Sequence, residues 1–120
     1  MMDSSQIQVS QDQSINVMKF NLPEWIDSLE IDGLMDLALR SLDKSAGERW
    51  IIDLSDVAYL GSAMLGLMVN LRERIRQAGG KLVLCGLSPE LLRIFQACCL
   101  ERLFTIAKTR PEAITAAGRG

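Results

Sequence analysis

The hydroxyl group with the most scope for chemistry belongs to Ser62, which stands where a short apolar run gives way to a long amphipathic segment. Residues 50–54 are mostly apolar, as in a buried strand, and apolar residues recur at helical spacing after Ser62. The first turn of a helix has backbone N–H groups without partners and the positive end of the helix dipole. The sequence therefore predicts that Ser62 either caps this helix or accepts a phosphate there.

Two acids lie close to the same junction. Asp53 and Asp56 flank Ser55, and two neighbouring carboxylates raise the question of a metal site. An acid at the end of a strand, followed by a turn in which its side chain accepts a backbone hydrogen bond, is the more ordinary structure for this pattern. The sequence therefore favours a turn, with a metal site as the alternative.

The chain lacks the residues and motifs of several enzyme classes. It contains no histidine, so a Ser-His-Asp triad, a phosphohistidine and histidine metal ligation are excluded. It also lacks the glycine-rich motifs that hold nucleotide phosphates. We therefore expect a protein that is not an enzyme and has no cofactor or metal of its own. Any ATP used in its function is expected to come with a partner.

The three cysteines, Cys85, Cys98 and Cys99, match neither the spacing of a zinc site nor a CxxC redox motif. Each is predicted to be a small buried hydrophobic residue, with a redox-sensing Cys98–Cys99 pair as the alternative. Their pattern fits a reducing compartment.

Length and composition limit the possibilities further. A chain of 120 residues is long enough for one domain whose core needs no metal or disulfide. The core must be aliphatic, because 48% of residues are hydrophobic and only 5% aromatic. A net charge of −2 argues against nucleic-acid binding, which needs a basic face. The sequence shows neither a membrane span of about 20 apolar residues nor a signal peptide. We expect a cytoplasmic monomer.

Hydrophobic periodicity predicts alternating strands and helices. The apolar runs 50–54 and 81–85, separated by a helix, imply a right-handed parallel βαβ unit. We therefore predict a single small α/β domain with a mixed, mostly parallel sheet of four or five strands, helices and an N-terminal β-hairpin. The expected elements are a hairpin of 7–9 and 15–20, a helix over 31–42 after an Asp27–Glu30 capping box, strand 50–54, helix 62–78 ended by Gly79-Gly80, strand 81–85, a helix beginning at Ser88-Pro89, strand 103–106 and helix 111–117.

The segment WIIDLSDVAYLGSAMLGLM, followed by a long helix, GG and KLVLCGLSPELLRIF, resembles the STAS domain. It is most similar to the small stand-alone bacterial anti-sigma factor antagonists, also called anti-anti-sigma factors. The resemblance covers residues 7–117 and leaves a flexible N-terminal tail, residues 1–6, and a C-terminal tail, residues 118–120. It implies a phosphoprotein that regulates transcription by partner switching.

In that family the motif before the long helix usually reads Asp-Ser-Ser-Gly-Leu-Gly, and a partner kinase phosphorylates the first serine. The phosphoacceptor then falls on Ser62, whereas Gly61 replaces the acid, Ala63 the second serine and Met64 the first glycine. Asp27 matches an acidic residue that the family uses near the same partner surface. The resemblance implies the partner-binding residues Asp27, Gly61, Ser62, Ala63, Met64, Leu65 and Gly66.

The implied partners are an anti-sigma factor serine kinase, which brings ATP, and a metal-dependent serine phosphatase. The unphosphorylated protein would bind the kinase, and phosphorylation of Ser62 would end that binding. The alternative is a non-phosphorylated STAS adaptor subunit of a transporter-associated or sensory assembly. In the adaptor, Ser62 would be a helix cap and the loop around it a constitutive docking surface.

Overall fold

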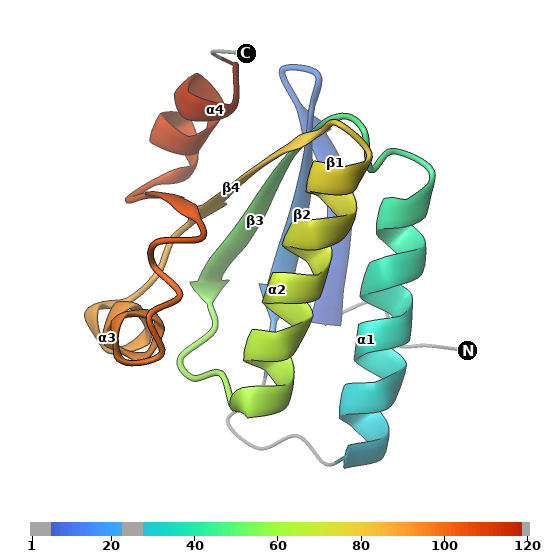
Figure 1. Ribbon diagram of the computed structural model, residues 1–120. Coiled ribbons are helices and arrows are strands. Elements are labelled where there is room, and N and C mark those ends of the chain that lie inside the picture. The colour runs from blue at the N-terminus through green and yellow to red at the C-terminus, as the bar shows by residue number, and fades with distance from the viewer. Residues whose placement is uncertain (1–5, 23–27, 119–120) are drawn as a thin grey trace.

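The computed structural model describes residues 6–22 and 28–118, and its centre is one five-stranded sheet with the order β1-β2-β3-β4-β5 (Figure 1). β1 pairs antiparallel with β2, and the remaining neighbours pair in parallel. The predicted mixed, mostly parallel sheet with an N-terminal hairpin is confirmed. The strands are β1 (Ile7–Asp12), β2 (Ile15–Asn21), β3 (Arg49–Asp56), β4 (Lys81–Cys85) and β5 (Thr105–Ala107).

Helices cover both faces of the sheet. Figure 1 shows α1 and α2 side by side in front of the sheet, with their N-terminal ends at the same end of the molecule. α4 packs against the opposite face, over β3 and β4. The helices of the described residues are α1 (Ser28–Asp43), α2 (Ser62–Gln77), α3 (Pro89–Ala97) and α4 (Arg110–Gly118).

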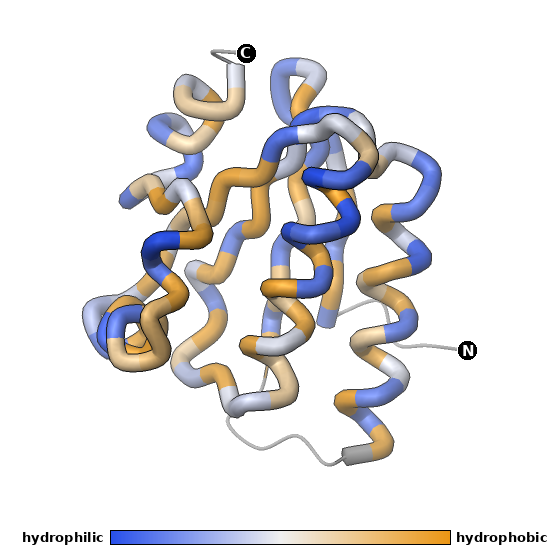
Figure 2. Tube along the Cα trace, viewed as in Figure 1, coloured by the Kyte–Doolittle hydropathy of each residue, from blue (hydrophilic) through white to orange (hydrophobic). Residues whose placement is uncertain are grey.

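Two apolar layers hold these elements together, because successive side chains of a strand point to opposite faces. Ile52 of β3 belongs to the larger layer, which includes buried residues of α1, α2 and α3. Its neighbour Ile51 belongs to the smaller layer, which α4 closes with Ala113 and Ala117. In Figure 2, apolar segments alternate with polar segments along α1 and α2, as expected of helices with one buried side.

Most elements differ from the prediction by one to three residues at one end or both, and β1 continues to Asp12 where the prediction ended it at residue 9. The differences in β3, β5 and α4 are the following. β3 continues to Asp56 because this residue still pairs with Asn21 of β2. The last strand begins only at Thr105, because Leu103 belongs to a turn in which its N–H donates to the Leu100 carbonyl. α4 extends to Gly118, one residue beyond the predicted end.

The helix ends follow their sequence signals where these can be seen. The Ser88 hydroxyl accepts a hydrogen bond of 3.1 Å from the Leu91 N–H, so its predicted role as N-cap of α3 is confirmed. Gly79 has φ +86° and provides the predicted left-handed stop after α2. The Asp27–Glu30 capping box cannot be followed, since Asp27 lies outside the described residues.

The cysteines divide into two groups. Cys85 is buried, as predicted, but the buried role predicted for Cys98 and Cys99 is wrong, because both are exposed. Cys98 is the C-cap of α3, and Cys99 turns the chain with φ +58°. The chain returns to the core only at Leu100, whose N–H donates to the Phe95 carbonyl at 2.8 Å.

Candidate functional site

The candidate site begins with the loop that joins β3 to α2. Val57 and Leu60 are buried in the main core and fix the loop at two points. Between them, Ala58 and Tyr59 face outward, and 62% of Tyr59 is exposed. Tyrosine is one of the residue types enriched at the anchor points of interfaces. No pattern in the sequence indicates that Tyr59 belongs to an interface, because only the burial of its neighbours shows that it faces solvent.

The N-cap of α2 is Gly61, and Ser62 follows it as the first residue of the helix. Gly61 is the N-cap residue of α2, with φ −78° and ψ 176°, and no side chain caps the helix. Its carbonyl accepts the first helical hydrogen bond, from the Leu65 N–H at 3.0 Å. Ser62 is the first helical residue, so the first of its two predicted roles, that of helix cap, is wrong. A side chain already inside the helix does not sit where it can accept from the N–H groups of the following turn.

The Ser62 hydroxyl is exposed and makes no hydrogen bond to any residue of the described chain. The first turn of α2 carries no acid. Among the described residues, no side chain caps the first N–H groups of α2, and no acid of its own first turn offsets the partial positive charge of the helix end. The hydroxyl is therefore accessible to another protein, and a negative group attached to it would lie in a favourable field.

The other predicted contact residues separate into two sets. Ala63 and Gly66 are exposed, and Gly66 lies one turn beyond Ser62 on the same side of α2. Met64 and Leu65 are 2% and 8% exposed and pack in the main core. Their side chains pack the helix against the core and are not accessible to a partner. Asp27, also predicted as a contact, lies outside the described residues.

Gly66 has no structural need to be glycine. A Cβ atom built on it meets nothing within 4 Å. Glycine in the interior of a helix costs roughly 0.5–1 kcal/mol relative to alanine. The fold would therefore be more stable with alanine here, so helix stability does not explain the glycine.

Gly61 also has room for a side chain. The nearest atom to a Cβ at this position is Cε2 of the Tyr59 ring, at 3.9 Å, which is an ordinary contact. Its φ of −78° suits any residue. The absence of the acid that the family motif carries here is thus not forced by packing, and the exposed ring of Tyr59 borders the position instead.

The acids at the end of β3 are both paired. Asp53 is 5% exposed and accepts hydrogen bonds on Oδ2 from Arg110 Nη2 at 2.8 Å and Nε at 3.2 Å. Its Oδ1 accepts from the Ser55 N–H at 2.9 Å, which confirms the predicted turn. Asp56 lies 3.2 Å from the Lys19 amine. No group of three metal-ligating side chains occurs among residues 6–22 and 28–118.

Burial alone would raise the pKa of Asp53, but the hydrogen bonds from Ser55 and the charge and hydrogen bonds of Arg110 outweigh it and hold the pKa below its ordinary value. Burial, together with the Asp53 carboxylate, raises the pKa of the Cys85 thiol to about 11. Asp53 therefore stays ionised and ties α4 to the sheet. Arg110 and Asp53 are 57 positions apart in the sequence, so no local pattern predicts their contact.

Comparison with known proteins agrees with this architecture. The family model of the STAS domain matches residues 6–113. The chain belongs to the STAS domain family. Among the described residues of this STAS domain, no helix has both the length and the apolar character needed to cross a membrane.

Several relatives and structural neighbours of this STAS domain are named as anti-sigma factor antagonists. BtrV of Bordetella bronchiseptica, named as an anti-sigma factor antagonist, is 29% identical over 103 residues, covering 72% of this chain and 89% of BtrV. An anti-sigma factor antagonist domain from Planctomyces limnophilus has a similar structure, with a TM-score of 0.83 and 23% identity over 93% of this chain and 97% of that one. The phosphorylated form of Bacillus SpoIIAA superposes with a TM-score of 0.63 and 19% identity, over 92% and 97% of the two chains.

Proposed function

We propose that this STAS domain is an anti-sigma factor antagonist that binds an anti-sigma serine kinase and is switched off by phosphorylation at Ser62. The observation that carries the proposal is the exposed Ser62 hydroxyl, which has no hydrogen-bond partner among the described residues and lies at a helix N-terminus with no acid in its first turn. The name of BtrV supports the regulatory role. The phosphorylated form of SpoIIAA supports the view that this fold tolerates a phosphate.

The proposed reaction needs no catalytic group from this chain. The kinase brings ATP, and the Ser62 Oγ attacks the γ-phosphorus as its proton passes to a base of the kinase. The bond from the γ-phosphorus to the bridging oxygen breaks, and ADP leaves. A metal-dependent phosphatase would restore the hydroxyl by hydrolysis of the phosphoserine. The chain itself contributes an accessible hydroxyl on a rigid helix end.

A phosphate at Ser62 would act on the complex and not on the fold. It adds roughly −1.5 to −2 charges. At the N-terminus of α2 these charges are favourable by about 0.3–1 kcal/mol. A like charge of the kinase about 4 Å away would be repelled by about 4 kcal/mol at the effective dielectric of a protein surface. A loss of only about 2.8 kcal/mol weakens binding about a hundredfold.

The residues around Ser62 suit such an interface. Tyr59 offers an aromatic ring on one side, while Ala63 and Gly66 leave a low surface that a partner backbone can approach. With Gly61 in place of an acid, the described residues Tyr59, Gly61, Ala63 and Gly66 carry no charge beside Ser62 until it is modified. The phosphate would then be the main electrostatic difference between the two states.

The test is to incubate the full chain with candidate anti-sigma kinases and ATP and to measure its intact mass. We expect the mass of one phosphoryl group to be added to the wild type and to a Ser10→Ala control, since Ser10 is an exposed serine of β1. Ser62→Ala should gain none. Stable binding to a kinase without any phosphate gain would instead indicate the constitutive adaptor.

A further inference from the structure

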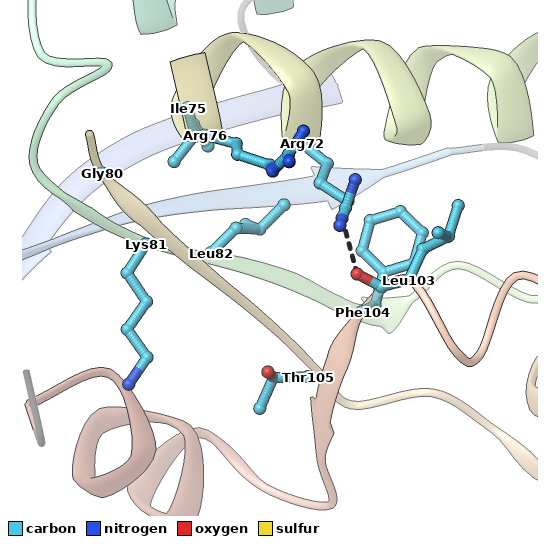
Figure 3. A pocket seen from close by; sticks show the side chains of 9 residues that line it. All are labelled: Arg72, Ile75, Arg76, Gly80, Lys81, Leu82, Leu103, Phe104 and Thr105. Atoms are coloured by element: carbon cyan, nitrogen blue, oxygen red, sulfur yellow. Dashed lines mark hydrogen bonds between the residues drawn. The ribbon is translucent and has the colours of Figure 1, made fainter. Parts of the chain in front are cut away.

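A cavity of about 180 Å³ lies at the far end of α2 from Ser62, between the second half of α2, the start of β4 and the chain that enters β5 (Figure 3). Ser62 and Arg76 are 14 positions apart on one helix, which corresponds to about 21 Å along its axis. The cavity is therefore separate from the candidate switch site.

Arg72 and Arg76 supply positive charge at the cavity. Arg72 donates through Nε to the Leu103 carbonyl at 2.6 Å and through Nη1 to Glu73 at 2.9 Å. The same Glu73 carboxylate lies 3.7 Å from Arg76, so one acid serves two guanidinium groups. None of the described residues that line the cavity is an acid. One positive charge is left in excess, in a chain whose net charge is negative.

Lys81 also lines the cavity, but its amine does not lie beside the two guanidinium groups. Its amine donates to the Ala116 carbonyl of α4 at 2.8 Å, and Figure 3 shows the side chain pointing toward α4, away from the two arginines. Arg72 is held by Leu103 and Glu73. Among the described residues, Arg76 has only the long contact to Glu73, and its side chain is 68% exposed. Arg76 is therefore the guanidinium with the most freedom to meet a ligand.

The rest of the cavity wall combines apolar side chains with polar groups. Ile75 and Phe104 are almost fully buried in the core, whereas Leu82 is half-buried and 39% of Leu103 is exposed. Figure 3 shows Leu82 pointing from β4 toward α2. The Thr105 side chain adds a hydroxyl at the opposite side. Since a water molecule occupies about 30 Å³ of liquid, the cavity has room for about six waters, or for a small organic molecule.

We propose that this cavity binds a small organic anion, with a carboxylate or phosphate head at Arg72 and Arg76 and a short apolar group against Leu82 and Leu103. Guanidinium groups bind both kinds of head through paired hydrogen bonds. The apolar wall selects an anion that carries a hydrocarbon part over a bare inorganic ion. Such a ligand would act on this domain independently of Ser62.

The test is an NMR titration of the full ¹⁵N-labelled chain with benzoate, phenyl phosphate, benzyl alcohol and inorganic phosphate. We expect benzoate or phenyl phosphate to shift the amide signals of Leu82, Leu103 and Thr105. The neutral alcohol and inorganic phosphate should each bind at least about tenfold more weakly. The two organic anions distinguish a carboxylate ligand from a phosphate ligand.

Charge reversal provides the matched variants. Arg76→Glu should weaken binding of the preferred anion at least about tenfold, the effect of losing one charged hydrogen bond. Arg93→Glu, on the exposed side of α3 and outside the cavity, should leave it unchanged. Unchanged amide spectra elsewhere would show that both variants are folded. The proposal is overturned if benzyl alcohol binds as well as benzoate, if inorganic phosphate matches phenyl phosphate, or if both variants bind alike.

Discussion

Replacement of Gly66 by alanine should make the domain more stable and a worse partner. The new methyl group enters open space, since nothing lies within 4 Å of the Cβ position. Its effect on folding is then the difference in helix propensity, a gain of about 0.5–1 kcal/mol. For a domain of this length the gain corresponds to a rise in melting temperature of roughly 2–5 °C.

The same methyl group should weaken binding to the kinase, because it projects from the exposed side of α2 one turn after Ser62. We expect a loss of about tenfold, from overpacking of a close contact by about 1.4 kcal/mol. Asn70→Ala, one turn further along α2 and also exposed, is the matched control and should leave affinity unchanged. Calorimetric melting and titration with the kinase measure the two effects.

The reasoning about Gly66 would be refuted in either of two ways. A lower melting temperature would mean that the glycine serves the fold after all. Higher stability with undiminished affinity would mean that the surface beside Ser62 does not meet the partner.

Three further changes probe the loop and the link to α4. Tyr59→Ala should lower the affinity for the kinase by roughly tenfold or more, as expected for an aromatic anchor of an interface. The melting temperature should not change, because the ring is exposed. An unchanged affinity would show that Tyr59 is not part of the interface. Gly61→Asp should change the free energy of unfolding by only a few tenths of a kcal/mol. It should also speed phosphorylation of Ser62, measured as the rate of mass gain. A large destabilisation would contradict the finding that a side chain has room at position 61. Arg110→Ala should cost roughly 2–3 kcal/mol in urea unfolding at neutral pH, below the loss for a fully buried pair because Arg110 is a third exposed. The lowered pKa of Asp53 gives stability that is present above its ordinary pKa of 3.8 and is lost as the pH falls through the lower pKa of the folded state. Arg110→Ala should therefore make the free energy of unfolding depend less steeply on pH in acid. An unchanged pH dependence would contradict this.

Much of the fold follows from local patterns. The alternation in the first 20 residues predicts the hairpin, and the strand 81–85 has the predicted bounds. Ser88 caps α3 as predicted because an N-cap depends only on the next three residues. These elements depend on interactions that neighbouring residues of the chain determine.

The remaining features depend on packing that no local pattern contains. α2 begins at Ser62 as predicted, but its N-cap is Gly61 and no side chain caps it, which the spacing of the apolar residues does not show. The exposure of Cys98 follows from where α3 ends relative to the core. The link between Asp53 and Arg110 arises only when α4 packs on the sheet.

The most direct test of the central claim is the affinity of the kinase for three variants of Ser62, measured by titration calorimetry. Ser62→Ala should bind like the unphosphorylated wild type, because the hydroxyl makes no hydrogen bond within the described chain. Ser62→Asp and Ser62→Glu place a negative charge at the same exposed position and should bind about a hundredfold more weakly. Equal affinity of all three variants would contradict the claim that charge at Ser62 controls binding.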